Sequence, residues 1–494
     1  MALDKISSPV PVANTKKIVS RNNSKENMLS SEFLGKSASV TQNDHHPAST
    51  SRHMRHKSWT PIIDNLKPPE ETEDTPMYVL IVTYLNYALL VLLGHVNDFF
   101  GRIFRPSNYK HLKEQNGYAP LLTDFETFYT RRLYKRIRDC WNRPVTGVPG
   151  RTLTVLERES RDSHETFQLT GRKIETLNLG SYNYLGFAQN VGPCIDAVLE
   201  CLKTEDLSLG SPRSELGNLA IHERVEQLVA RFVGAEDAMV FSMGYGTNAT
   251  MISALVGPGS LIISDQLNHS SLVNGSRLSG AAIKVFQHND HRDLERVLRQ
   301  SISQGQPRTH RPWRKILVIV EGLYSMEGTI CRLPQIIELK KKYKFYLFVD
   351  EAHSIGALGP RGRGVCDFWS VDSKEVDVQM GTFTKSFGAA GGYIAGSKEM
   401  INRFRYSGHG FVYCEPMPAP ICQQIITSMS IIMGEEGGIE GLQRLQSIYE
   451  NSIYFMRELR NMGFIVYGDE GSPVIPLLIF HPGKIAAFSR EALA

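Results

Sequence analysis

The sequence predicts an α/β fold in which a mostly parallel sheet is covered by helices on both faces. The main evidence is a series of short apolar runs at residues 238–242, 260–264, 282–287, 315–322, 345–352, 376–383 and 391–396. Most of these runs are continuously apolar, as strands buried on both faces are. Between them lie helix-length segments such as 293–302 and 333–343, with apolar residues at i, i+3 and i+4. Strands and helices that alternate in this way build a parallel sheet.

The composition excludes several classes of protein. The 494 residues are enough for about three domains, and 55 basic against 51 acidic residues give a net charge of only +4. A chain so close to charge balance is not expected to bind nucleic acid. The hydrophobic fraction of 41% excludes collagen-like, coiled-coil and multi-span membrane proteins. The seven cysteines include no Cys-x-x-Cys pair, so we expect a reducing compartment and no metal site.

The chain divides into five predicted regions. Residues 1–76 are rich in Ser, Asn, Pro, Lys and His and too poor in apolar residues to bury a core, so we expect them to be disordered. Residues 77–98 form a predicted membrane segment, and residues 99–170 form a helical connecting region. Residues 171–425 form a large domain that contains the predicted sheet, and residues 426–494 form part of a smaller C-terminal α+β domain.

The predicted membrane segment begins with MYVLIVTYLNYALLVLLG at residues 77–94, in which 15 of 18 residues are apolar. This length just suffices to cross a bilayer. A buried core helix is the alternative, but apolar residues cover every face, which favours a segment that crosses the membrane or lies in its plane. Acidic residues precede it, and the basic residues that follow it are Arg102, Arg105, Lys110 and Lys113. By the positive-inside rule, the rest of the chain would face the cytosol.

Residues that carry chemistry are expected at the carboxyl ends of the strands, because ligands bind there in parallel sheets. Asp350 directly follows the run FYLFV and is either a helix cap or a buried charge with a partner. Lys385 follows VDVQMGTFT, where burial would lower its pKa and make it a nucleophile, although a solvated lysine is the ordinary alternative. His269 follows another strand, and Gly244 and Tyr245 lie where a strand meets a helix. Backbone amides at such a helix start bind anions, and a tight turn is the simpler interpretation.

Taken together, these residues match the needs of one cofactor. A phosphate cradle, a histidine that could stack on a ring, an acid for a ring nitrogen and a lysine that could form a Schiff base follow in that order. Pyridoxal 5'-phosphate requires these parts, because a charged partner of its ring nitrogen makes the ring an electron sink and a lysine holds its aldehyde. The set therefore predicts a pyridoxal phosphate enzyme.

Six motifs in this order resemble those of the α-oxoamine synthases, the fold-type I pyridoxal phosphate enzymes that condense an amino acid with an acyl-CoA. They are GSYNYLG (180–186), FSMGYGTN (241–248), DQLNHSS (265–271), EGLYSMEG (321–328), DEAHSIG (350–356) and GTFTKSFG (381–388). Within this family, GSYNYLG, the run RDCWNRP (138–144) and the membrane segment resemble the catalytic subunit of the branch that uses serine and a long-chain acyl-CoA. The resemblance covers residues from about 100 to 494.

The resemblance implies a role for each matching residue. Lys385 would form the Schiff base and later remove the Cα proton of serine. Asp350 would pair with the ring nitrogen, His353 with the ring oxygen, and His269 would stack on the ring face. The phosphate and the ring edge would be contacted by Gly244, Tyr245, Thr382, Thr384 and Ser325.

The roles of three further positions stay open. Arg213 and His222 match family positions of less certain role, and a surface helix residue is an equal interpretation for both. Tyr182 replaces an asparagine of the related synthases, and it would either help to select serine over glycine or pack in the core.

The implied reaction is the decarboxylating condensation of L-serine with a long-chain acyl-CoA, normally palmitoyl-CoA, to 3-ketodihydrosphingosine, the first step of sphingolipid synthesis. This branch of the family works at the endoplasmic reticulum membrane as a heterodimer with a homologous long-chain-base subunit 1 that lacks the lysine. The presence of Lys385 therefore implies that this chain is the catalytic partner. Another synthase of the family and a catalytically inactive assembly or regulatory subunit are the alternatives.

The end of the sequence leads us to expect a truncated C-terminal domain. The family closes this domain with further strands, which supply an arginine for the carboxylate of the amino acid. Here a predicted strand at 474–480 and a predicted helix at 482–494 are the last elements, and Arg490 is not in a comparable place. We expect the apolar helix face of Ile485, Phe488 and Leu493 to be only partly covered. We also expect cofactor binding with little or no condensation.

Overall fold

The central sheet contains the seven strands that the apolar runs predict. They are β4 (Asp237–Phe241), β5 (Leu261–Asp265), β6 (Ala282–Phe286), β7 (Ile316–Glu321), β8 (Tyr346–Asp350), β9 (Val378–Thr382) and β10 (Gly392–Gly396). Their order across the sheet is β4-β10-β9-β8-β7-β5-β6. Neighbouring strands from β9 to β6 are parallel, whereas β10 runs antiparallel to both β4 and β9. The mostly parallel sheet is thus confirmed.

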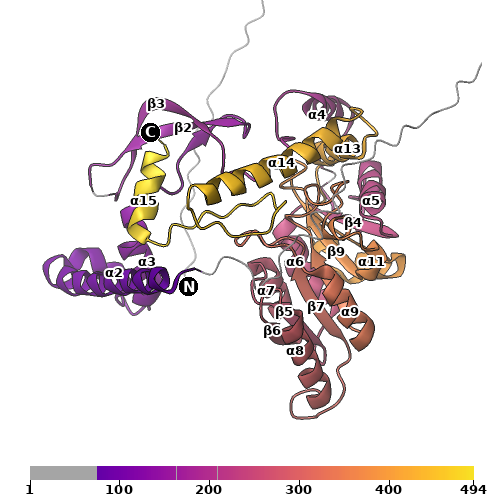
Figure 1. Cartoon of the computed structure of the whole chain (residues 1–494), viewed down its shortest axis with the longest axis horizontal. Helices are drawn as coiled ribbons and strands as arrows, with labels where there is room; N and C mark the ends of the chain where they lie inside the picture. The colour runs from indigo at the N-terminus through magenta and orange to yellow at the C-terminus, as the bar shows by residue number, and fades with distance from the viewer. Residues whose placement is uncertain (1–74, 163, 209, 494) are drawn as a thin grey trace, which may run out of the picture. The chain divides into compact units, whose positions relative to one another are not determined.

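Both faces of the sheet are covered by helices (Figure 1). On β7, Leu317 and Ile319 belong to the core cluster of one face, and Val318 and Val320 belong to the cluster of the other face. This two-sided burial explains why the strand sequences are continuously apolar. The helices of one face are α5 (Ala220–Val233), α8 (His291–Gln304), α9 (Leu333–Tyr343) and α13 (Ala419–Met433), and those of the other are α6 (Gly244–Leu255), α7 (Ser270–Leu278) and α11 (Lys398–Ser407). The helices predicted at 293–302 and 333–343 are α8 and α9.

This computed structural model describes residues 75–493 apart from 163 and 209. The region predicted to be disordered lies outside the described residues, except for its last two positions. The remaining helices of the described part are α2 (Met77–Phe104), α3 (Asp124–Arg132), α4 (Pro193–Thr204), α10 (Val365–Phe368), α12 (His409–Val412), α14 (Glu440–Asn461) and α15 (Pro482–Glu491). Short 3-10 turns lie at η2 (Pro106–Leu112), η3 (Tyr134–Ile137) and η4 (Ser373–Glu375).

The region from 99 to 170 is not only helical, as the sequence led us to expect. It also contributes to a three-stranded antiparallel sheet made of β1 (Val145–Thr146), β2 (Thr152–Glu159) and β3 (Gln168–Leu177). In TLTVLERE only Val155 is buried, so β2 packs one face at most and carries no continuous apolar run. A search for doubly buried strands therefore misses this type of strand.

The predicted strand at 474–480 is wrong. This segment is irregular, and the pair Val466 and Leu477 forms an isolated bridge. Pro473 and Pro476 explain the difference, because proline has no N–H group to donate to a ladder. The predicted last helix exists as α15, where Ile485 and Phe488 are partly exposed as expected.

The predicted membrane segment is the helix α2, which continues six residues beyond the expected end at residue 98. It is long and apolar enough to cross a bilayer, and most of its side chains are exposed. Only Gly94 and Asp98 of this helix are buried, whereas a core helix would bury most of its apolar side chains. The buried-core alternative is therefore wrong.

Candidate active site

The proposed chemical groups gather at the carboxyl edge of the sheet. The parallel strands β7, β8 and β9 end there with Glu321, Asp350 and Thr382. Glu321 and Asp350 are direct neighbours in the ladder. The antiparallel β10 starts at the same edge, because Gly392 pairs with both Thr382 and Phe241. The residues that the strand-end rule singles out therefore share one edge of the sheet.

Asp350 is a buried carboxylate with two N–H donors. Its Oδ2 accepts a hydrogen bond from Asn248 Nδ2 at 2.7 Å, and its Oδ1 accepts one from the Ala352 amide at 2.9 Å. Burial raises the pKa of Asp350, while these two donors and the charge of Lys385 act in the opposite direction. The side chain is thus held in one orientation at the end of β8.

Glu321 is a second buried carboxyl group beside Asp350. Its Oε1 accepts a hydrogen bond from the backbone amide of His269. Burial and the neighbouring charge of Asp350 raise the pKa of Glu321 well above its ordinary range. Because Asp350 has two donors and Glu321 has one, Asp350 is the better place for a negative charge and Glu321 the better place for a proton.

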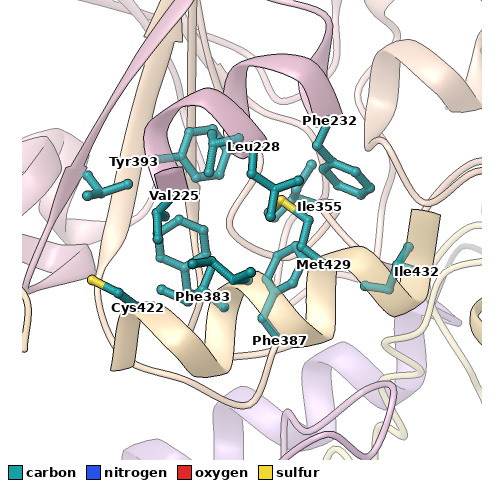
Figure 2. Packing of buried hydrophobic residues seen from close by; sticks show 14 of the residues in the cluster. Val225, Leu228, Phe232, Ile355, Phe383, Phe387, Tyr393, Cys422, Met429 and Ile432 are labelled. Atoms are coloured by element: carbon teal, nitrogen blue, oxygen red, sulfur yellow. The ribbon is translucent and has the colours of Figure 1, made fainter. Parts of the chain in front are cut away.

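Lys385 lies in a loop that the hydrophobic core anchors. Phe383 and Phe387, two residues before and after it, are fully buried in a cluster with residues of α5 and α13 (Figure 2). The Lys385 Nζ donates to Thr382 Oγ1 at 3.3 Å. Burial lowers the pKa of Lys385, and Asp350 and Glu321 partly offset this effect. A solvated surface lysine, the ordinary alternative, is therefore wrong for this residue.

His269 is the N-cap of α7, where its Nδ1 accepts from the Ser271 amide at 3.2 Å. Its exposed ring lies edge-on to the ring of Tyr245, with centroids 5.9 Å apart. The Tyr245 hydroxyl in turn accepts a hydrogen bond from Asn274. The site thus presents an accessible imidazole that two neighbouring elements orient.

His353 is held by an aromatic pair from the GSYNYLG motif. The Tyr184 hydroxyl bonds to His353 Nδ1 at 2.8 Å, and Tyr182 stands edge-on to the imidazole with centroids 5.4 Å apart. Burial lowers the pKa of His353 to about 3, with smaller contributions from Lys385 and His269. His353 is thus a neutral imidazole at pH 7. Tyr182 is 53% exposed, so the interpretation as a core residue is wrong.

The helix α6 starts at Gly244, directly opposite the lysine loop. No side chain caps its N-terminus, so its first amides are available to an anion. A Cβ at Gly244 would lie only 2.7 Å from Thr382 Cγ2. This close approach of α6 to the end of β9 leaves a cradle that only glycine allows, next to the Thr382 and Thr384 hydroxyls, which are 3.3 Å apart.

Ser325 lies in the tight turn after β7, which the C-terminal segment holds. The Gly328 amide bonds to the Tyr324 carbonyl at 2.8 Å and closes this turn. Asp469 accepts hydrogen bonds from the Ile330 amide at 2.7 Å and from Arg332 at 3.0 Å. Ser325 is partly buried and stands on the same edge of the sheet as the other residues.

The other two candidate residues support the fold. Arg213 is buried and bonds to Glu226 at 2.6 Å and to Asn218. His222 is fully buried, and its Nε2 lies 2.7 Å from the Met417 carbonyl. A surface position, which the sequence allowed for both, is wrong. Among the described residues, neither forms a hydrogen bond or an ion pair with Lys385 or Asp350.

The residues present fit pyridoxal phosphate. A buried carboxylate, a partly buried lysine, a glycine at a helix start and an accessible imidazole lie at one edge of the sheet, and the Asn248 Oδ1 has no hydrogen-bond partner there. Among the described residues, no group of three or more His, Cys, Asp or Glu side chains could hold a metal ion.

The sequence analysis missed three residues of the site, namely Tyr184, Asn248 and Glu321. Each of them lies in a strand, helix or motif that the sequence had already indicated. Glu321 is the last residue of β7 and lies within the predicted strand at 315–322, and Asn248 lies one helical turn after Gly244 on the same face of α6. Tyr184 belongs to the same motif as Tyr182.

Comparisons with known proteins agree with this geometry. The family "Aminotransferase class I and II" matches residues 174–494. Serine palmitoyltransferase 2 of Schizosaccharomyces pombe is 52% identical, over 90% of this chain and 75% of the relative. Serine palmitoyltransferase 2 of Saccharomyces cerevisiae is 53% identical, over 86% and 76%. Serine palmitoyltransferase 3 of Homo sapiens is 51% identical, over 86% and 77%.

Solved structures of serine palmitoyltransferases are also similar to this chain. Serine palmitoyltransferase of Sphingomonas wittichii superposes with a TM-score of 0.61 and 29% identity, over 72% of this chain and 82% of that one. A variant of the S. paucimobilis enzyme, solved with a bound aldimine of pyridoxal phosphate and myriocin, has a TM-score of 0.56 and 27% identity, over 68% of this chain and 78% of that one.

Proposed function

The chain belongs to the serine palmitoyltransferase family, and from this premise we propose that the residues at its sheet edge condense L-serine with palmitoyl-CoA. The protein is a serine C-palmitoyltransferase, its cofactor is pyridoxal 5'-phosphate, and its reaction is the first step of sphingolipid synthesis. The single observation that carries the residue assignment is the convergence of Lys385 and Asp350 at one edge, where the charge of each acts on the other.

The proposed roles follow from the geometry. Bound cofactor supplies an electron sink for the bonds at Cα of serine. Lys385 Nζ would hold the aldehyde carbon of the cofactor until the amine of serine replaces it, and would then take the proton from Cα, which its lowered pKa favours. Asp350 would supply the negative charge for the ring nitrogen, because Asn248 and the Ala352 amide donate to its oxygens and hold them in place.

The other residues would hold and orient the cofactor and the serine substrate. The first amides of α6, Gly244 to Gly246, would bind the phosphate together with Thr382 and Thr384. The ring of His269 would cover one face of the cofactor, and neutral His353 would contact the ring oxygen. Tyr182, which stands beside His353 with an exposed ring, is placed to contact the serine side chain. Ser325 would contact the ring edge from the turn after β7.

The setting of the reaction is also part of the proposal. We place the chain at the endoplasmic reticulum membrane with its catalytic domain in the cytosol, and we expect a heterodimer with a homologous subunit that lacks the lysine. The apolar and exposed helix α2 supports the membrane attachment, since both acyl-CoA and product partition into bilayers.

The test is turnover by the purified complex with the partner subunit. Lys385→Ala should fold, pair with the partner and lose the visible absorbance of the lysine-bound cofactor together with all condensation. Lys398→Ala, an exposed lysine at the start of α11, is the matched control and should retain both. Turnover by Lys385→Ala would refute the assignment, and a preference for glycine over serine would refute the proposed substrate.

A further inference from the structure

A cavity of about 430 Å³ lies at the amino edge of the sheet, opposite the edge that holds Lys385 and Asp350. Its lining residues come from the starts of β7, β8 and β9, from the end of the antiparallel β10 and from the C-terminal turn of α6. Strands of five residues, at about 3.3 Å per residue, separate this edge from the other by roughly 15 Å. The cavity shares no residue with the candidate active site.

One wall of the cavity is apolar and belongs to the core on the sheet face that α6 and α11 cover. Leu317 and Phe404 in this wall are almost completely buried, so the packing of the core fixes the wall in place. The volume falls within the range of about 300 to 1,000 Å³ in which proteins hold small ligands. The cavity therefore has room for the apolar body of a small molecule. The apolar side chains of the wall are Ala254, Leu255, Leu317, Val378, Met400 and Phe404.

Lys315, just before β7, brings a positive charge to this apolar wall. Its Nζ donates at 2.9 Å to the carbonyl of Leu255, the last residue of α6, which has no acceptor role within the helix. An ammonium group carries three donor hydrogens, so two of them remain for a ligand. Burial and the charge of Arg403 lower the pKa of Lys315, and no carboxylate of the described chain offsets them. A ligand that supplies a negative charge would therefore stabilise Lys315.

Arg403 lines the same cavity from α11 and is exposed to solvent. Like Lys315, it forms no ion pair with any residue that the structure describes. The acidic residue Asp377 does have a partner, because it pairs with Lys340 at 2.8 Å. When Lys340 is included, the charged groups at the cavity have a surplus of one positive charge, which one monoanion would neutralise. The basic groups are Lys315, Lys340, Lys374 and Arg403, and the acidic groups are Glu236, Asp377 and Glu399.

We propose that this cavity binds a monoanionic amphiphile, namely a carboxylate with a short aliphatic chain. The carboxylate would accept hydrogen bonds from Lys315 Nζ and from the Arg403 guanidinium, and the chain would lie against the wall of α6 and α11. An inorganic anion would leave the apolar wall in contact with water, and a neutral alcohol would leave both cations without a partner. Only a ligand with both parts satisfies the whole cavity. The proposal goes beyond the condensation of serine and does not depend on it.

The test is photocrosslinking of the full chain as holoenzyme, purified with its partner subunit in lipid nanodiscs. The probe is octanoic acid with a diazirine in its chain, and the crosslinked peptides are identified by mass spectrometry. Labelling should fall on residues 251–256 or 400–404, which line the cavity from α6 and α11. Excess octanoate should displace the probe, whereas octanol and inorganic phosphate should not. Excess palmitoyl-CoA should leave this labelling unchanged, because the condensation site lies at the other edge of the sheet.

Two variants and a control test the contributions of charge and space. Arg403→Gln removes one of the two cations and should lower the labelling about tenfold, as the loss of a hydrogen bond to a charged group does, with turnover as in the parent. Ala254→Leu adds methyl groups to the apolar wall and should also lower the labelling. Arg299→Gln, at an exposed arginine of α8 that does not line the cavity, is the matched control and should be labelled like the parent.

Each other result overturns the proposal in a distinguishable way. If octanol displaces the probe as well as octanoate does, the cavity takes apolar molecules without regard to charge. If inorganic phosphate displaces the probe, the two cations form a general anion site. Labelling of Arg403→Gln at the level of the parent would show that this arginine holds no carboxylate, and labelling confined to the condensation site would leave the cavity without a ligand. Turnover with serine and palmitoyl-CoA is measured separately, so failure here leaves the proposed function untouched.

Discussion

Two equally buried glutamates should respond in opposite ways when they lose their charge. Glu351, next to Asp350, is 1% exposed, and Glu226 is 4% exposed. Glu351 accepts hydrogen bonds from Ser354 and from the Val365 amide but has no basic partner among the residues that the structure describes. Glu226 pairs with Arg213 at 2.6 Å and with Arg405 at 3.3 Å. The comparison between Glu351→Gln and Glu226→Gln therefore isolates the effect of an unpaired buried charge.

The size of the effect follows from the pKa of Glu351, which burial raises from 4.5 to about 7. Between these values the native state binds a proton that the unfolded chain has already lost, so the free energy of unfolding falls as the pH rises. A difference of this size corresponds to about 3 kcal/mol. Glu351→Gln keeps an acceptor for the Val365 amide and lacks the charge, so it should be about 3 kcal/mol more stable than the parent at pH 8. At pH 4.5 or below this advantage should vanish.

Urea unfolding at pH 5 and pH 8, followed by tryptophan fluorescence, measures both variants against the parent. Glu226→Gln should be destabilised by about 3 to 5 kcal/mol, because it leaves the buried charge of Arg213 without its partner. If Glu351→Gln is no more stable than the parent at pH 8, the carboxyl group ionises in the folded protein without a penalty. The reasoning from burial would then be wrong.

Three further predictions concern the site. Asp350→Asn should retain most cofactor binding but lower kcat about a hundredfold or more, since it removes the charge opposite the ring nitrogen; a rate near that of the parent would make Asp350 only a cap. Glu321→Gln keeps the acceptor for the His269 amide and should bind pyridoxal phosphate within about threefold of the parent, whereas Glu321→Ala should lose more than about tenfold. Equal losses in a cofactor titration would show that the charge of Glu321 matters, not its hydrogen bond. Gly244→Ala should weaken cofactor binding at least about tenfold because its Cβ would meet Thr382 Cγ2 at 2.7 Å, whereas Gly246→Ala faces the flexible Met243 at 3.3 Å and should bind normally. Similar affinities for the two alanine variants would mean that α6 does not bind the phosphate.

The large domain could be predicted well from the sequence because its strands are buried on both faces. Burial on both faces requires an apolar residue at every position, as in the run from Ile316 to Val320, and such runs stand out from their surroundings. The sheet of β1 to β3 carries no such run, since β3 has mostly exposed side chains from Gln168 to Leu177. Its strands are specified by pairing with each other, which a local pattern does not reveal.

In the candidate site, too, local patterns could be predicted from the sequence and contacts between distant segments could not. The strand-end rule located Asp350 and Lys385, because each directly follows an apolar run. It gave no information on long-range partners. The bond between Tyr184 and His353, or between Glu321 and the His269 amide, joins segments that are far apart in the sequence. Only the tertiary fold shows that these groups meet.

The place of the antiparallel strand β10 between β4 and β9 affects the order in which the large domain folds. This strand lies between β4, which leads into the start of α6 where we propose that the phosphate binds, and β9, which leads into the loop of Lys385. Phe241 and Thr382 are brought to either side of Gly392 only when β10 has been inserted. During synthesis, β4 leaves the ribosome long before β10, so its edge stays open while the intervening strands emerge. A nascent chain that ends before Gly396 therefore cannot assemble the two halves of the site, and capture of the cofactor belongs to the last stage of folding of the large domain.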